Sequence, residues 1–175
     1  ERQKADNVSG LLGESGFREY MNQLDTPLET GYLLRIGIDH FKEINDNFGQ
    51  EYGDFVLKKS AECISGCISE GQKVYKLVAD EFLILDVSSD EAKDADKLYD
   101  KVREAIDRFI ETNEFKVMYT VSGGIVPFAA LKGNQYAEAL KLTDFTLNEA
   151  KKLGRNRCYI FNGETYRKFL RKREI

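Results

Sequence analysis

The feature that most constrains the fold of this chain is a pair of β-rich runs, residues 73–77 and 82–87, separated only by residues 78–81. Two strands so close in sequence form an antiparallel hairpin. Around this hairpin, hydrophobic periodicity predicts the order α-β-α-α-β-β-α-β-α-β-α. Helices that alternate with strands, interrupted by one hairpin, predict an α+β fold of ferredoxin-like type, in which helices pack on a mixed sheet.

Other segments carry clear patterns of their own. Residues 32–38 are a largely apolar run of strand length, which predicts a buried central strand. Further strands are expected over residues 115–126 and 158–161, and Gly123-Gly124 indicates a bulge or a close approach of the backbone. Helices are expected over residues 15–25, 52–69, 89–112, 134–153 and 164–173, with a short one that ends near residue 47.

Length, charge and cysteine content limit the class of protein. The 175 residues suffice for one domain, and a formal net charge of -4 argues against a general nucleic-acid binder, which needs a positive field. A small anionic nucleotide needs only a local basic cluster. Apolar runs fall short of the roughly 18 residues of a membrane helix, so no membrane contact is expected from this segment. Three cysteines without a disulfide framework predict a reducing, cytoplasmic location, or the cytoplasmic part of a larger protein.

The organisation predicted from the sequence has three parts. Residues 1–14 form an opening segment or linker, residues 15–162 form the domain, and residues 163–175 form a connector helix that leads to a further domain. The basic run in the connector, residues 167–173, is interpreted as a solvated helix rather than a binding patch. The chain is therefore expected to be a piece of a longer protein.

Two groups of residues suggest nucleotide chemistry. Residues 38–42 are the end of a strand that turns into a helix, where unpaired backbone amides can hold a phosphate. At the hairpin tip, Asp80 and Glu81 are adjacent carboxylates, one of which could meet a divalent ion such as Mg²⁺. Taken alone, an acidic hairpin tip is more often only solvated.

Together these pieces resemble the GGDEF family, the diguanylate cyclases, along almost the whole chain. Five ordered stretches at family spacing carry the resemblance and indicate a shared fold and ancestry. They are residues 6–11 (DNVSGL), residues 38–49 (IDHFKEINDNFG) with Gly53-Asp54, residues 78–82 (VADEF) at the place of the G-G-D/E-E-F signature, residues 121–125 (VSGGI), and Ala150-Lys151 with Gly154-Arg155-Asn156.

The resemblance implies a GTP-binding surface. Asn45 and Asp54 would hydrogen-bond the guanine edge, whose N1–H and N2–H donors suit a carboxylate. Helix capping is the alternative role for Asn45, and pairing with a helix dipole is the alternative for the two basic residues of the last stretch. The residues implied to contact the β- and γ-phosphates are His40, Phe41, Lys42, Lys151 and Arg155.

The sequence departs from the family pattern at the reaction centre. Active members have a metal-binding aspartate on the first strand, and the residue here is Gly37. Asp80 and Glu81 keep the catalytic positions, so Mg²⁺ would be held, with weakened coordination, by Asp80 and the backbone carbonyl of Ile38. Asp39 could partly replace the missing ligand. Loss of one such electrostatic element costs about 3–4 kcal/mol, or about 100- to 1,000-fold in rate.

The hairpin tip departs as well, because Val78 and Ala79 replace the two glycines of the signature. A tight turn favours residues without a Cβ, and a β-branched valine is a poor choice for a positive φ angle. We expect a reshaped hairpin or a side chain that intrudes on GTP. Residues 69–72 also lack the R-x-x-D motif of the family, so no inhibitory product site is expected.

The resemblance therefore implies a degenerate bacterial GGDEF domain in cyclic di-GMP signalling, with the cyclase reaction lost and GTP binding kept. Such a domain would regulate an adjacent domain, sensory or of EAL phosphodiesterase type. Two alternatives stay open. One is an active diguanylate cyclase, which converts two GTP to cyclic di-GMP in a transient homodimer. The other is an interaction module that binds no nucleotide.

Overall fold

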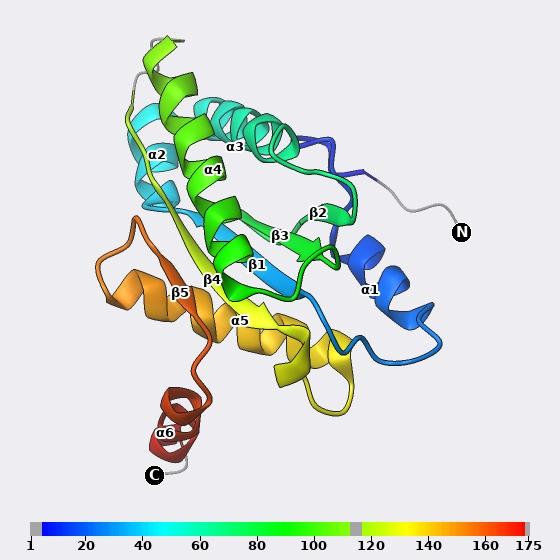
Figure 1. The fold of residues 1–175 in the computed structure, drawn as a ribbon. Helices are drawn as coiled ribbons and strands as arrows, with labels where there is room; N and C mark the ends of the chain where they lie inside the picture. Colours follow the sequence, from blue (N-terminus) through cyan, green and yellow to red (C-terminus); the bar gives the residue numbers. More distant parts are fainter. Residues whose placement is uncertain (1–4, 113–116, 174–175) are drawn as a thin grey trace.

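The structure is a computed structural model that describes residues 5–112 and 117–173 (Figure 1). Helices and strands follow one another in the predicted order. The strands are β1 (Tyr32–Ile38), β2 (Gln72–Lys76), β3 (Glu81–Asp86), β4 (Val121–Pro127) and β5 (Cys158–Ile160). The α-helices are α1 (Glu14–Asn22), α2 (Phe41–Phe48), α3 (Gln50–Ser65), α4 (Ala92–Thr112), α5 (Gln135–Lys152) and α6 (Gly163–Arg173), and a short 3-10 helix that the sequence did not predict covers Phe128–Ala130.

The strands form one mixed sheet in the order β2-β3-β1-β4-β5. β2 and β3 make the predicted antiparallel hairpin, and β1 pairs antiparallel with both β3 and β4. β5 runs parallel to β4. Helices cover both faces of this sheet (Figure 1). The α+β class predicted from the sequence is confirmed, and β1 is its central strand.

The alternation of side chains along β1 assigns each face of the sheet to a different set of helices. Leu34 and Ile36 belong to the hydrophobic core that contains residues of α3 and α4, whereas Leu33 belongs to the core that contains residues of α1 and α5. Arg35 and Gly37 follow the alternation of Leu33 and therefore face α5. This face carries the departures from the family pattern.

Two predicted boundaries differ from the structure. β4 begins at Val121, so residues 117–120 of the predicted strand have no regular structure, and residues 115 and 116 lie outside the described residues. α3 ends at Ser65 rather than near residue 69, with Gly66 as its C-cap residue. The first difference lies beside the turn after β1, because the Asp39 amide donates to the Thr120 carbonyl at 2.9 Å.

The Gly123-Gly124 pair marks a close approach of the backbone, not a bulge. Both residues continue the pairing of β4 with β1 without interruption. A Cβ added at Gly124 would lie 2.5 Å from the backbone nitrogen of Leu147 in α5. Because only glycine leaves this space, α5 packs directly on the backbone of β4. The contact fixes the position of the C-terminal end of α5, where two predicted phosphate ligands lie.

The C-terminal helix α6 packs on α5, on the side away from the rest of the domain (Figure 1). Phe145 of α5 contacts Tyr166 and Phe169 of α6, with ring centroids 4.9 and 5.0 Å apart. The predicted connector is therefore helical through Arg173, while residues 174 and 175 lie outside the described residues. None of the helices in the described ranges combines the length and the apolar character that crossing a membrane requires.

Candidate nucleotide-binding site

The turn after β1 has the form that the sequence predicts for a phosphate site. β1 ends at Ile38, His40 has a left-handed backbone with φ of 57°, and α2 begins at Phe41. The first backbone amides of a helix have no partner inside it, and they carry the positive end of the helix dipole. His40 and Lys42 are both exposed beside these amides. The turn can therefore receive an anion.

Asp39 has a different environment from the one a metal ligand needs. Its side chain is buried, and its oxygens accept hydrogen bonds from the hydroxyls of Thr120 and Ser122, both at 2.6 Å, and from the backbone amide of Asn156 at 3.0 Å. β1 ends one residue before Asp39, so the alternation that would place it on the face of Gly37 does not reach it. Asp39 instead ties the ends of β1 and β4 to the loop after α5.

The helices α2 and α3 pack closely at Asn45 and Gly53, the residue before the second predicted guanine ligand. A Cβ added at Gly53 would lie 1.7 Å from Asn45 Oδ1, so only glycine permits this contact between the helices. Asn45 Oδ1 is buried and has no hydrogen-bond partner within the described part of the chain. Asp54 follows Gly53 directly and is half-buried. A buried acceptor without a partner is uncommon in folded proteins and marks a polar group that a ligand can satisfy.

The hairpin tip keeps a tight turn without the two glycines. Ala79 takes the left-handed conformation, with φ of 57°, which costs a residue with a Cβ about 1–2 kcal/mol. Nζ of the buried Lys76 offsets this strain by donating to the carbonyls of Leu77 at 2.6 Å and Ala79 at 2.5 Å. Burial lowers the pKa of Lys76. The neighbouring Val78 side chain is 70% exposed at the rim of the turn.

Gly37 lies directly beside the carboxylate of Asp80. In the sheet it is opposite Glu81 on β3. A Cβ added at Gly37 would lie 3.8 Å from Asp80 Oδ2 and 3.6 Å from Glu81 Cγ, with Leu147 Cδ2 at 3.3 Å. A carboxylate carried by residue 37 would therefore stand next to that of Asp80. Glycine supplies neither the charge nor the oxygen.

Glu81 is paired with an arginine that the sequence analysis did not single out. Arg35 Nη2 lies 2.6 Å from Glu81 Oε1, and Arg35 Nε donates to the same oxygen at 2.7 Å. Arg35 also donates to the Leu140 carbonyl and the Thr143 hydroxyl of α5. Lys151 adds a second cation 3.9 Å from Glu81 Oε2. With side-chain exposures of 9% and 15%, Arg35 and Glu81 interact largely out of water.

The second carboxylate of the tip, Asp80, forms no ion pair among the residues that the structure describes. Burial raises the pKa of Asp80, the charge of Glu81 adds to the rise, and Lys151 opposes it. Across residues 5–112 and 117–173, no group of three or more His, Cys, Asp or Glu side chains is placed to hold a metal ion. Because Gly37 offers no oxygen and Glu81 is bound to Arg35, the side chains present do not fit a two-metal arrangement.

The predicted nucleotide ligands line separate cavities. His40 lines a cavity of about 300 Å³ beside α2, and Asp54 lines one of about 520 Å³ next to residues 7–10. Lys151 and Arg155 line a third, of about 600 Å³, between α5 and α6. The structure therefore places Asn45 against Gly53, the residue before Asp54, while these three cavities of the described residues each hold a different subset of the predicted ligands.

The fold and this arrangement of turn and acidic hairpin define a domain of the nucleotidyl cyclase class. The family model for the GGDEF domain of diguanylate cyclases matches residues 4–157. The chain therefore belongs to the GGDEF family.

Individual relatives agree with this assignment. The diguanylate cyclase VdcA of Vibrio cholerae is 28% identical over 156 residues, which are 87% of this chain and 45% of VdcA. The cyclic di-GMP phosphodiesterase NbdA of Pseudomonas aeruginosa is 28% identical over 162 residues, 90% of this chain and 20% of NbdA. The chain thus spans less than half the length of either protein. The solved GGDEF domain of PA1120 (TpbB or YfiN) from P. aeruginosa shares the fold, with a TM-score of 0.79, 24% identity, and coverage of 95% of this chain and 99% of that one.

Sequence reasoning missed Arg35 and Lys76. A signal for Arg35 was present, because it is a lone charge inside an apolar strand and a buried charge needs a partner. No comparable signal exists for Lys76. Its acceptors are backbone carbonyls of the turn, and they become visible only when the turn is folded.

Proposed function

We propose that this chain is a degenerate GGDEF domain of cyclic di-GMP signalling, which binds GTP and does not condense it to cyclic di-GMP. The observation that carries the proposal is Gly37. A side chain at this position would stand beside Asp80 Oδ2, where the resemblance places the metal-binding aspartate of active members, and glycine has no side chain to offer.

GTP binding is supported by the elements around α2. The phosphates would meet the amides of His40 and Phe41 and the ammonium of Lys42, at a helix start that is open to solvent. Guanine would meet Asn45, which packs against Gly53, and Asp54, the next residue of α3. Lys151 and Arg155, at the C-terminal end of α5, would add charge to the same phosphates.

The environments of the two remaining carboxylates, Asp80 and Glu81, support loss of the reaction. Asp80 would hold Mg²⁺ weakly, with the Ile38 carbonyl as its companion, because a second acidic side chain is missing. Glu81 Oε1 forms an ion pair with Arg35 Nη2 at 2.6 Å. This pair offsets the negative charge that Glu81 would otherwise present to a substrate. Loss of one electrostatic element of this kind lowers a rate about 100- to 1,000-fold, and here two elements are affected.

The role that follows is regulatory. A domain that binds GTP without consuming it can report GTP to a neighbouring domain, sensory or of EAL type, in a cytoplasmic protein. The similarity to NbdA, whose name is that of a phosphodiesterase, supports an association with cyclic di-GMP breakdown. The net charge of -4 argues against nucleic acid as a partner. A transient homodimer remains compatible with this role.

Isothermal titration calorimetry with GTP tests the binding half of the proposal. Asp54→Ala removes charge-assisted hydrogen bonds worth about 1.5–3 kcal/mol, so GTP affinity is expected to fall about 10- to 150-fold. Asp46→Ala is the matched control, since Asp46 is an exposed aspartate on the neighbouring helix α2. Equal GTP affinity in the parent and in Asp54→Ala would refute the guanine assignment, and absence of binding to the parent would favour an interaction module.

A further inference from the structure

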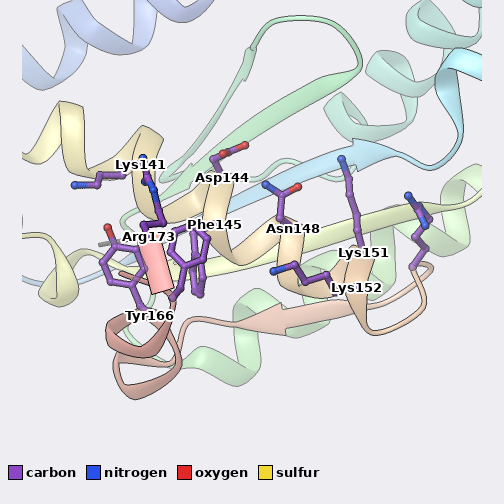
Figure 2. A pocket seen from close by; sticks show the side chains of 10 residues that line it. Lys141, Asp144, Phe145, Asn148, Lys151, Lys152, Tyr166 and Arg173 are labelled. Carbon is purple, nitrogen blue, oxygen red and sulfur yellow. The ribbon is translucent and has the colours of Figure 1, made fainter. Parts of the chain in front are cut away.

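A basic groove lies between α5 and α6 (Figure 2), and we call it the α5–α6 groove. It borders the acidic hairpin tip only at Lys151, whose Nζ lies 3.9 Å from Glu81 Oε2. It has a volume of about 600 Å³, in the size range of small-molecule sites. The chain as a whole has a net charge of -4. A local excess of positive charge of this kind concentrates anions in the groove. The charged side chains that line it are five basic ones and one acidic one: Lys141, Lys151, Lys152, Arg155, Arg173 and Asp144.

Most of this positive charge is not neutralised by the protein. Lys141, Arg155 and Arg173 form no ion pair within the described residues. Lys152 lies 3.3 Å from Glu149, and Lys151 lies 3.9 Å from Glu81. The single acidic residue, Asp144, lies 3.8 Å from Arg35, which takes up part of its charge. The groove therefore presents cations to a ligand from both helices.

An aromatic wall accompanies these cations. Phe145 of α5 and Tyr166 and Phe169 of α6 line the groove and contact one another. Lys152 and Arg173 lie 5.9 and 5.7 Å from the centre of the Phe169 ring, one from each helix. Figure 2 shows Arg173, Phe145 and Tyr166 gathered toward one end of the groove and Lys151 toward the other.

Cations beside aromatic rings define the chemistry of the ligand. Lysine and arginine side chains bind phosphate oxygens through charge-assisted hydrogen bonds, and aromatic side chains stack against planar rings with little preference for one base. We propose that the α5–α6 groove is a second ligand site, which takes a nucleotide-class ligand: one or more phosphates attached to a planar aromatic ring. This site does not depend on Asp54 or on the hairpin carboxylates.

A ligand in the groove would act on the position of α6. This helix has no buried residue, and its attachment to α5 runs largely through the Phe145, Tyr166 and Phe169 contacts. A ligand that bridges Lys152 of α5 and Arg173 of α6 would strengthen that attachment. The basic run interpreted from sequence as a solvated helix would then be one wall of a binding site.

The proposal is tested in the Asp54→Ala variant, in which the guanine contact is removed. GTP and ATP, used as probes in calorimetry, are expected to bind this variant with affinities within about threefold of each other, because ring stacking is tolerant of the base. Adding Lys152→Glu and Arg173→Glu together is expected to lower the affinity for both nucleotides at least about tenfold, because two charges that attract phosphate are reversed. Both residues are exposed, so the fold is expected to be kept.

Lys168→Glu in the same background is the matched control. Lys168 is an exposed lysine of α6 that pairs with Glu164 and does not line the groove, and its reversal is expected to leave both affinities unchanged. NMR shifts of the Tyr166 and Phe169 ring protons on addition of ATP give an independent readout. Three results would overturn the groove as a site. They are absence of ATP binding, an equal loss of affinity in the Lys168→Glu control, and ATP binding without shifts of these ring protons. None of these outcomes depends on whether Asp54 contacts guanine in the parent.

Discussion

Two regions of the molecule have diverged to different degrees from the family pattern. The recognition side, formed by His40, Asn45 and Asp54 around α2, keeps residues that match the pattern. The reaction side, at the end of β1 and the hairpin tip, has a glycine beside Asp80 and an alanine in the signature turn. Because the two sides are built on different elements, one can change while the other keeps its shape.

The altered side is not loosely built. Arg35 and Glu81 form a largely buried ion pair, and Lys76 holds the turn through two carbonyls. Protein cations therefore lie beside Glu81, which pairs with Arg35 and Lys151. Both features agree with the proposed degenerate domain, in which the reaction side is structural and the recognition side binds GTP.

Among the variants that test this comparison, Arg35→Met has the largest expected effect, a loss of stability. Removal of one partner from a buried pair typically costs about 3–5 kcal/mol, because the other charge is left without compensation. The free energy of unfolding from urea titrations is expected to fall by about 3 kcal/mol, near the lower end of that range because Lys151 also lies near Glu81.

The matched variant for this prediction is the double change Arg35→Met with Glu81→Gln. It removes both charges and is expected to recover most of the lost stability, since no ion remains buried alone. If Arg35→Met alone leaves the urea midpoint unchanged, the reaction side is not held by this pair.

Gly37→Asp sharpens the comparison by returning a carboxylate to the reaction side. The new side chain would begin 3.8 Å from Asp80 Oδ2, so the two acids repel each other until a divalent ion binds between them. Millimolar Mg²⁺ is expected to raise the melting temperature of this variant by about 2–4 °C, equivalent to about 1 kcal/mol of binding linkage. The parent is expected to shift by much less.

Gly37→Asn has the same shape without the charge and serves as the control for this experiment. Its melting temperature is expected to respond to Mg²⁺ no more than that of the parent. An equal response of Asn and Asp at this position would show that the gap beside Asp80 is not a missing metal ligand.

Asp80→Asn gives the smallest effect and tests the electrostatics of the tip. Burial raises the pKa of Asp80, so the folded state holds the proton more tightly than the unfolded chain does. Stability is therefore lost as pH rises from the ordinary carboxyl pKa to the raised pKa of the folded state. The variant removes this loss. Its free energy of unfolding at pH 7 is expected to exceed that of the parent by less than about 1 kcal/mol, because solvent screens a partly exposed carboxylate.

Calorimetry at several pH values checks both the sign and the window of this effect. The difference in free energy of unfolding between Asp80→Asn and the parent is expected to shrink as pH falls below about 4, the ordinary carboxyl pKa, because the parent carboxyl then becomes neutral in both states. A variant less stable than the parent at pH 7 would mean that the ionised form of Asp80 is stabilised in the fold.

The sequence predicted the elements whose signals are local. The apolar run of β1 was bounded correctly at Tyr32 and Ile38, and the hairpin followed from the short spacing of its strands. Gly123-Gly124 predicted a close approach, and the structure shows α5 to be the element that makes it. The order of α-helices and strands was also predicted, while the 3-10 helix at Phe128–Ala130 was not.

Features that depend on distant partners could not be predicted. Arg35 and Glu81 are 46 residues apart, and their pairing depends on the register between β1 and β3. The alternation argument for Asp39 failed to foresee its hydrogen bonds to Thr120 and Ser122, because the strand ends just before it. The α5–α6 groove depends on how the last helix packs, which periodicity alone does not specify.

The most direct test of the central claim is turnover. The purified chain is incubated with labelled GTP and Mg²⁺, and products are separated by chromatography over many hours. We expect the protein to retain GTP and cyclic di-GMP not to accumulate. Sustained formation of cyclic di-GMP that requires Asp80 would contradict this expectation and would show that a single carboxylate beside Gly37 is enough for the reaction.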